Sequence, residues 1–251
     1  MVLKIPLFLI MRSTTSTRFF QRPFLVACLL TAGIWGCGSP EDPDRSFFQI
    51  LAEDEHFVDG SLSFQKSQGK VTGIDLEGYS GETLPQEIAT LSGLKGLKLI
   101  NCKVREISIV RRFPLLWSLS IYNSALEEIP DLSSLTNLWG VSFSGTNLSD
   151  TIDGKWFPSQ LRQLTVNRSD ITHITHLQNL SALEDLSLAY NNLGVLSIPV
   201  CRLDSLNRLT ISGNPLWVDP ASEELECLKS FASQNELTAD SVVWDKLGLE
   251  P

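Results

Sequence analysis

The chain has 251 residues, of which 43% are hydrophobic and 20% are charged. This is enough apolar material for a core, which excludes a wholly disordered chain and a small scaffold stapled by disulfides. The first 36 residues carry four basic residues and no acid, so removing those four positive charges from the net charge of −9 leaves −13 for residues 37–251. Such an acidic body repels phosphate backbones, and we expect no nucleic-acid partner.

The N-terminal segment has the layout of a secretory signal peptide. A basic, Ser/Thr-rich stretch ends at Arg22 and is followed by an uncharged, mostly apolar run over residues 23–36. This run is shorter than the ~20 apolar residues that a membrane-spanning helix needs. We therefore expect residues 1–36 to be a signal peptide rather than a permanent membrane span.

The end of this run resembles a bacterial lipobox, in which a cysteine after a small residue receives lipid. Residues 34–37 (IWGC) carry the resemblance, with Gly36 before Cys37. It implies cleavage before Cys37, lipid attachment to Cys37, and a membrane-anchored lipoprotein of the cell envelope, in the outer membrane if the cell has one. The alternative is that Cys37 is an ordinary residue beside a different cleavage site.

The next two segments are expected to connect the anchor to the body. Residues 37–45 are rich in Pro and acid, which predicts an extended tether. Residues 46–70 are expected to form an N-terminal cap. Its residues 46–49 (SFFQ) open like a capping box, and Phe47, Ile50 and Leu51 share one face of the predicted helix.

The body is built from a repeat of 22 or 23 residues. Positions four and six of every unit are apolar and alternate with mostly polar positions. The seven units begin at Val71, Leu94, Leu116, Leu138, Leu161, Leu183 and Leu206. The alternation predicts one short strand with a buried face in each unit. Such strands pair side by side when the chain makes one coil per unit, which gives a parallel sheet along one side of a solenoid.

The repeat resembles the leucine-rich-repeat pattern LxxLxLxxNxL. Residues 183–193 (LEDLSLAYNNL) and 206–216 (LNRLTISGNPL) match it most fully, and the resemblance covers about residues 71–228. It implies an α/β fold: a right-handed, horseshoe-shaped solenoid of about seven repeats at residues 71–218, with a parallel sheet on the concave face, short helical turns outside, and helical caps. By analogy it also implies a module that binds another molecule.

Position nine holds the Asn of that pattern, whose side chain can bond backbone groups where the chain leaves the strand. Asn191 and Asn214 match the pattern. The earlier units instead carry compact residues there: Cys102, Ser124, Thr146 and Ser169. These fit inside a coil, whereas Tyr79 is too large, so we expect the first unit to be shaped by the cap before it.

Residues 219–251 are expected to form a C-terminal cap and tail. Pro220 and the acids after it are typical of a helix start. The helix that follows should cover the last coil with its apolar face, which consists of Leu225, Leu228 and Phe231. The ending VVWDKLGLEP can pack at the same place.

Candidate catalytic and metal-binding residues are few. His173 and His176 flank Ile174, which is expected to be buried, and have no third ligand nearby in sequence, so we expect no metal. Cys201 and Cys227 could pair between neighbouring coils, but burial of both as small apolar residues is favoured. No phosphate-binding Gly loop or nucleophile elbow is present, so we expect neither an enzyme nor a cofactor.

The outward positions of the sheet supply the candidate binding surface. Position five is a strip of mostly small, neutral side chains that another molecule can approach closely. Larger side chains surround this strip at positions two, seven and eight. We predict them as binding residues: Lys95, Ile100, Trp117, Tyr122, Trp139, Arg162, Arg168 and Tyr190.

Trp117 and Trp139 occupy position two of neighbouring coils, between Lys95 and Arg162. Strands ~4.8 Å apart would stack the two indoles with a cation at each end. The alternative, which the usual burial of large aromatic side chains favours, is that both rings fold inward against the margin of the sheet.

Together these patterns predict a non-catalytic, lipid-anchored binding module of the bacterial cell envelope that holds a protein partner on its concave face. The alternatives are a cell-wall glycan-binding protein that stacks sugars on Trp117 and Trp139, a purely structural envelope component, and an enzyme whose site is assembled from distant residues.

Overall fold

The computed structural model describes residues 3–5, 43–57, 60–148, 150–195, 203–216 and 223–249. Cys37 and most of the predicted signal peptide and tether lie outside these ranges. The exception near the N-terminus is β1 (Leu3–Ile5), which pairs antiparallel with β2. In the described part of the chain, no helix combines the length and the apolar character needed to cross a membrane.

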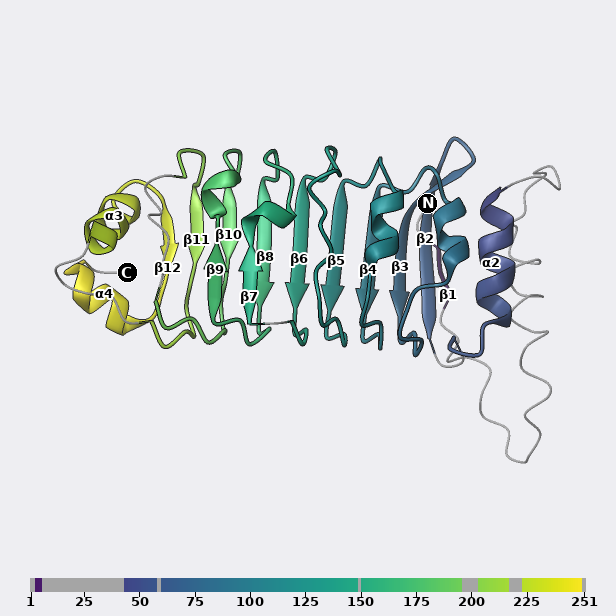
Figure 1. The fold of residues 1–251 in the computed structure, drawn as a ribbon, viewed down its shortest axis with the longest axis horizontal. Coiled ribbons are helices and arrows are strands. Elements are labelled where there is room, and N and C mark those ends of the chain that lie inside the picture. Colours follow the sequence, from purple (N-terminus) through teal and green to yellow (C-terminus); the bar gives the residue numbers. More distant parts are fainter. Residues whose placement is uncertain are drawn as a thin grey trace, which may run out of the picture.

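One ten-stranded sheet runs the length of the molecule (Figure 1). In spatial order its strands are β1, β2 (Ser61–Ser67), β3 (Lys70–Glu77), β4 (Gly96–Ile100), β5 (Ser118–Tyr122), β6 (Gly140–Ser144), β8 (Gln163–Asn167), β10 (Asp185–Ser187), β11 (Arg208–Thr210) and β12 (Glu236–Thr238). From β3 to β12 every neighbouring pair is parallel. Position four of all seven units and position six of the first five lie in this sheet, so the chain makes one coil per unit.

Equivalent positions of successive units are paired in register. Position four of one strand lies beside position four of the next, as Leu97 does beside Leu119, and the same holds for position six in the first five units. All fourteen side chains at these two positions are at most 2% exposed. The two rows therefore form a continuous apolar spine behind the sheet, as the alternation predicts.

The outer side of the coils consists of single turns and a small second sheet. The turns are the 3-10 helices η2 (Gln86–Thr90), η3 (Ser108–Arg112), η4 (Gly154–Trp156) and η5 (Leu177–Asn179). The second sheet pairs β7 (Thr151–Asp153) with β9 (His173–Thr175) and was not predicted. This sheet places Ile152, at position fifteen of the unit that begins at Leu138, beside Ile174, at position fourteen of the next unit. The extra residue of that 23-residue unit therefore lies before Ile152, and Thr151 at position fourteen is only half-buried.

The first helix, α2 (Pro43–Glu53), lies at the β2 end of the sheet (Figure 1). It starts inside the predicted tether, so the predicted start at residue 46 is wrong. Ile50 was expected to face the core but is 37% exposed, and Phe48 is buried in its place. The buried face is the i, i+3, i+4, i+7 set that begins at Asp44, whose carboxylate accepts the Val71 N–H at 2.6 Å.

A hairpin between the first helix and the repeats was not predicted. Strands β2 and β3 are antiparallel, and the turn between them has Gln68 and Gly69 at φ angles of 51° and 80°. Two central residues with positive φ are typical of the tight turns that suit the twist of a hairpin. The hairpin buries Leu62 and Phe64 beside the first repeat strand.

The C-terminal residues lie at the β12 end of the sheet (Figure 1). Helix α3 (Glu223–Ala232) buries Leu225, Leu228 and Phe231, as its periodicity predicts. The chain then adds β12, a parallel strand that the repeat pattern did not reveal, and ends in α4 (Ser241–Leu247). The second helix buries Val243, Trp244 and Leu247.

Position nine carries a polar ladder inside the coils. Its side chain accepts a backbone N–H of the preceding unit: Ser124 accepts from Cys102 at 3.0 Å, Asn191 accepts from Ser169 at 2.9 Å, and Asn214 accepts from Leu193 at 3.1 Å. The same side chains donate to nearby carbonyl oxygens, as Asn191 does to Val166. Compact Ser124 and Ser169 therefore take over the role of the missing Asn residues and satisfy groups that would otherwise be buried without a partner.

Removing one ladder hydroxyl should destabilise the fold. In Ser169→Ala, the hydroxyl that bonds Thr146 and the Asn167 carbonyl is lost. We expect unfolding in urea to show a loss of about 1–3 kcal/mol, because the partners stay buried. Ser142→Ala, on the outward face, is the control. Equal effects of the two substitutions would contradict the ladder.

Candidate functional site

The face of the sheet opposite the apolar spine, here called the outward face, has a hollow at its centre. The hollow has a volume of about 320 Å³ and lies over β5, β6 and β8. Its floor is formed by Ser120, Ser142 and Thr165, which occupy position five and are paired in register. Tyr122 and Trp139 also line this central hollow.

The central hollow is uncharged. None of its eleven lining residues is acidic or basic, and most carry a hydroxyl or an amide. Gln163 and Asn167 add amide groups to the hydroxyls of the floor. Such a surface can exchange hydrogen bonds with a peptide backbone or a neutral polar ligand without desolvating a charge.

The two predicted tryptophans form a stack beside the hollow. The ring centroids of Trp117 and Trp139 are 4.9 Å apart, and the ring planes differ by 12°. Trp117 is 51% exposed and Trp139 is half-buried. Inward packing of both rings, favoured from the sequence, is therefore wrong. Position two lies at the margin of the sheet. The buried row nearest to it is position one, to which Leu116 and Leu138 belong.

The predicted cations do not all behave alike. Arg162 follows Trp139 in the margin but forms an ion pair with Glu184 of the next coil. Lys95, on the other side of the tryptophans, is exposed. Contacts between cations and aromatic rings occur instead at positions five to eight. Lys98 Nζ lies 5.7 Å from the centroid of the Tyr122 ring, and the Arg168 guanidinium carbon lies 4.8 Å from that of Tyr190.

Position eight has a left-handed backbone in every unit. Gly or Asn, which accept this conformation most readily, occupies it in five units: Gly78, Asn101, Asn123, Gly145 and Gly213. Arg168 and Tyr190 are the exceptions, with φ angles of 51° and 56°. Bulky residues in this region are strained, and such strain tends to be kept where a side chain is needed for function. The Gly/Asn preference at position eight is a sequence signal that was missed.

Tyr190 stands out from the surface. It is 55% exposed, and its ring lies over Gly213, where a Cβ would come within 2.4 Å of a ring atom. Gly213 therefore makes room for the tyrosine. Ile100, also predicted as a binding residue, is only half-buried at the end of β4 and lies beside Tyr122 in register.

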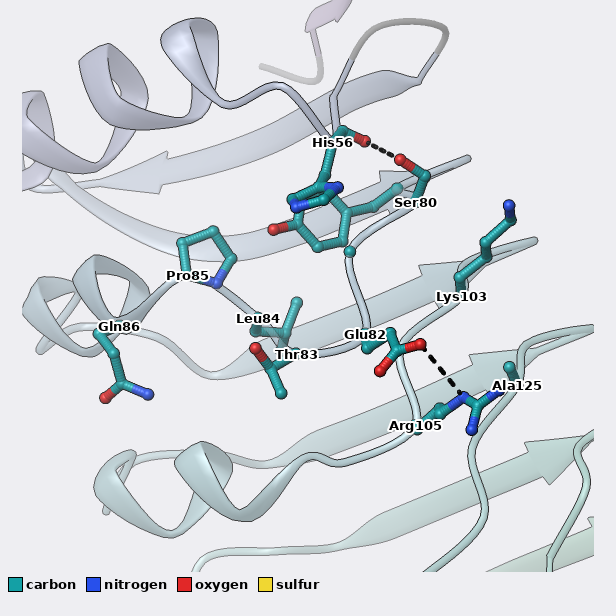
Figure 2. A pocket seen from close by; sticks show the side chains of 12 residues that line it. His56, Ser80, Glu82, Thr83, Leu84, Pro85, Gln86, Lys103, Arg105 and Ala125 are labelled. Carbon is teal, nitrogen blue, oxygen red and sulfur yellow. Dashed lines mark hydrogen bonds and ion pairs between the residues drawn. The ribbon is translucent and has the colours of Figure 1, made fainter.

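A second, larger depression of about 780 Å³ lies where the first coil meets the N-terminal segment, lined by His56, Tyr79 and Arg105 among others (Figure 2). Arg105 is paired with Glu82 at 3.8 Å and with Glu127 at 3.2 Å. Its charge is therefore used to link neighbouring coils.

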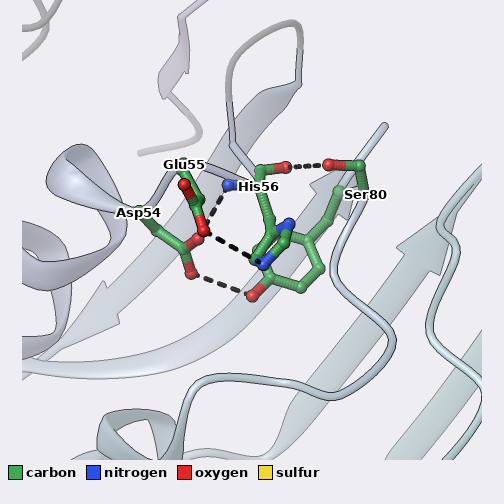
Figure 3. A network of polar contacts seen from close by, with 5 residues as sticks. Asp54, Glu55, His56 and Ser80 are labelled. Carbon is green, nitrogen blue, oxygen red and sulfur yellow. Dashed lines mark hydrogen bonds and ion pairs between the residues drawn. The ribbon is translucent and has the colours of Figure 1, made fainter.

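A polar network fixes that junction (Figure 3). The Tyr79 hydroxyl donates to Asp54 at 2.9 Å, and the Ser80 hydroxyl donates to the His56 carbonyl at 2.9 Å. Gly81 occupies position eleven of the first unit, where the other units have an aliphatic side chain. The Tyr79 ring takes up this space, because a Cβ on Gly81 would come within 2.6 Å of a ring atom. Burial and the bond to Asp54 raise the pKa of Tyr79. The first unit is thus shaped by the preceding segment, and we assign this depression a structural role.

The histidines of the fifth unit make local contacts. His176 Nδ1 lies 3.0 Å from an Asp153 carboxylate oxygen, and His173 Nδ1 lies 2.8 Å from the Thr172 hydroxyl. Ile174 between them is buried. Across the described ranges, no group of three or more His, Cys, Asp or Glu side chains comes close enough together to hold a metal ion.

The cysteines differ from the expectation in part. Cys227 is disulfide-bonded, and its partner lies outside the described residues. Cys227 is buried, as expected, and the disulfide is the alternative that the sequence left open, because sequence spacing does not show the side-chain directions on which a disulfide depends. Cys102 is free and buried, and burial raises the pKa of its thiol, which keeps it protonated and unreactive.

Comparisons with known proteins support the fold. No family model and no curated protein matches the chain. Among solved structures, 250 chains match. One is a leucine-rich-repeat protein of Leptospira interrogans, with 21% sequence identity, a TM-score of 0.50, and coverage of 66% of this chain and 48% of that chain. This chain thus spans about half of that structure. The likeness shows a leucine-rich-repeat-like fold, in agreement with the repeat pattern.

The exposure of the tryptophan stack can be tested by stability. In Trp117→Ala we expect a loss of about 0.5–1.5 kcal/mol in the free energy of unfolding, the range for an aromatic pair, because half of the ring is already in water. Trp139→Ala, which removes a more buried ring, should be more destabilising. A loss of about 3–5 kcal/mol for Trp117→Ala in urea unfolding would instead indicate a core residue.

Proposed function

We propose that this protein is a non-catalytic binding module that holds a partner protein on the outward face of its parallel sheet. The observation that carries the proposal is the central hollow, where a hydroxyl-lined floor lies next to a half-exposed tryptophan stack. Aromatic side chains that are exposed on the surface are typical of the residues that dominate protein interfaces. A leucine-rich-repeat-like fold is also one that commonly serves protein binding.

The side chains around the hollow suit recognition better than catalysis. No acidic, basic, histidine or cysteine side chain lines the hollow, and Ser120, Ser142 and Thr165 have no base among the lining residues to activate them. What the floor offers is a set of hydrogen-bonding groups at a regular strand spacing of about 4.8 Å. An extended chain can use such groups in succession.

Glycan binding is the second candidate, because Tyr122 and Trp139 line a hollow rich in hydroxyl groups. A sugar ring stacks on an open aromatic face, however, and the Trp117–Trp139 stack covers one face of each indole. The stack therefore leaves the ring edges and at most one face of each indole for a partner, which fits a groove on a protein surface better.

We also propose that the protein is a lipoprotein of the cell envelope, anchored through Cys37. The lipobox-like residues 34–37 support this, and so does the disulfide at Cys227, since disulfides persist mainly outside the cytoplasm. Metabolic labelling with a fatty acid should mark the wild type and not Cys37→Ala. An unlabelled wild type would contradict the anchor.

In-cell crosslinking tests the binding function. We expect a photo-crosslinking residue at Ser144, beside the hollow, to capture a discrete protein, whereas one at Gln178 on the outer side should not. Ser142→Arg, which fills the floor with a large side chain, should abolish the crosslink without lowering the melting temperature, because Ser142 lies on the outward face. Equal capture from both positions, or capture that survives Ser142→Arg, would contradict the proposal.

A further inference from the structure

Two cations flank the central hollow without a carboxylate partner. Lys98 lies on β4, on one side of the hollow, and Arg168 follows β8 at its other side. Each contacts a tyrosine ring, and neither forms an ion pair with a described carboxylate. Other arginines of the sheet do form such pairs: Arg208, for example, lies 2.9 Å from both Asp185 and Glu236.

One acidic residue in register with Lys98 and one close in sequence to Arg168 do not pair with these cations. Asp75 is paired with Lys98 in register, but it accepts the Ser63 hydroxyl, while Lys98 leans toward the Tyr122 ring on the opposite side. Asp170 lies two residues after Arg168 and is exposed without pairing to it. In a body with a net charge of −13, Lys98 and Arg168 place two positive charges at the edges of a neutral hollow.

The backbone gives independent support for Arg168. It holds a left-handed conformation that Asn or Gly accepts more readily at the same position of other units. Strain of this kind costs about 1–3 kcal/mol and is retained mainly where the side chain is used. Among the described residues, the Arg168 guanidinium contacts the Tyr190 ring and forms no hydrogen bond or ion pair. Its N–H donors therefore remain available to an anion.

The spacing of the two cations fits an extended peptide. Three strand spacings and three residues along a strand separate their backbone positions, which corresponds to about 14 Å by 10 Å, or about 17 Å in all. An extended chain advances about 3.3 Å per residue, so about five residues span this distance. The floor between the two cations offers the hydroxyls of Ser120 and Ser142.

We propose that the outward face binds an extended acidic peptide segment of its partner, with two carboxylates about five residues apart on Lys98 and Arg168 and the residues between them over the central hollow. This rests on the proposed protein-binding function and adds the chemistry of the partner. Distant acids of the body are screened beyond about 8 Å at physiological ionic strength, so the local cations decide the recognition.

Selection from a random dodecapeptide display library on the full-length chain tests this proposal. We expect selected peptides to be enriched in Asp and Glu about five residues apart. A selected peptide should lose affinity by about tenfold or more on Lys98→Gln or Arg168→Asn, as expected when a hydrogen bond to a charged group is lost. Replacement of its acids by amides should have the same effect. Arg168→Asn keeps a residue that accepts the left-handed backbone. Lys155→Gln, on the outer side, is the matched control and should change nothing.

Other outcomes overturn the inference in distinguishable ways. The acidic peptide is contradicted if selection gives no enrichment or gives peptides without acidic enrichment. It is also contradicted if the enrichment persists on the Lys98→Gln/Arg168→Asn double variant, or if a carboxylated polysaccharide binds preferentially. If the crosslink from Ser144 is nevertheless blocked by Ser142→Arg and unaffected by the double variant, the protein-binding function stands and this inference alone fails. If the protein with native Lys98 and Arg168 gives no Ser144-specific crosslink, the protein-binding function on which the inference rests is contradicted.

Discussion

The parallel register between neighbouring strands is the constraint on which the rest of the structure depends. Where the chain leaves each strand, at position nine, its backbone N–H and C=O groups are buried and no longer bond a neighbouring strand, so they need another partner in place of water. The position-nine ladder satisfies them from one coil to the next, as Asn191 does for Ser169. Because the ladder and the apolar spine repeat with the same period, a coil that shifted by one residue would lose both, and one register is strongly specified.

That register also creates the outward surface. Small side chains repeat at position five, so the hydroxyls of neighbouring strands line up into a floor, and larger side chains repeat at its margins. The stacked tryptophans follow from the same register. The backbone N–H of Trp139 donates to the Trp117 carbonyl, so the two rings lie on neighbouring coils. Recognition is thus built from rows of residues on different coils, which explains why no short motif announces it.

The sequence predicted the features that depend on the period and missed those that depend on local direction. The buried rows, the strands and the apolar face of α3 follow from spacing alone. The Gln68–Gly69 hairpin and β12 lie outside the repeat and carried no periodic signal. The exposure of Trp117 was missed because burial at a margin depends on which way the side chain turns. Arg168 was predicted as a binding residue but Lys98 was not, because the spacing does not show which cations form ion pairs with neighbouring coils.

Accessibility of single cysteines tests the central claim, an open outward face over a sealed spine, most directly. The account predicts that maleimide labels Ser142→Cys rapidly in the native protein, since Ser142 lies on the floor of the hollow, and leaves Phe143→Cys, one residue further and fully buried, unlabelled until the protein unfolds. Native protection of Ser142→Cys would show that the chain covers its own sheet and would contradict the account.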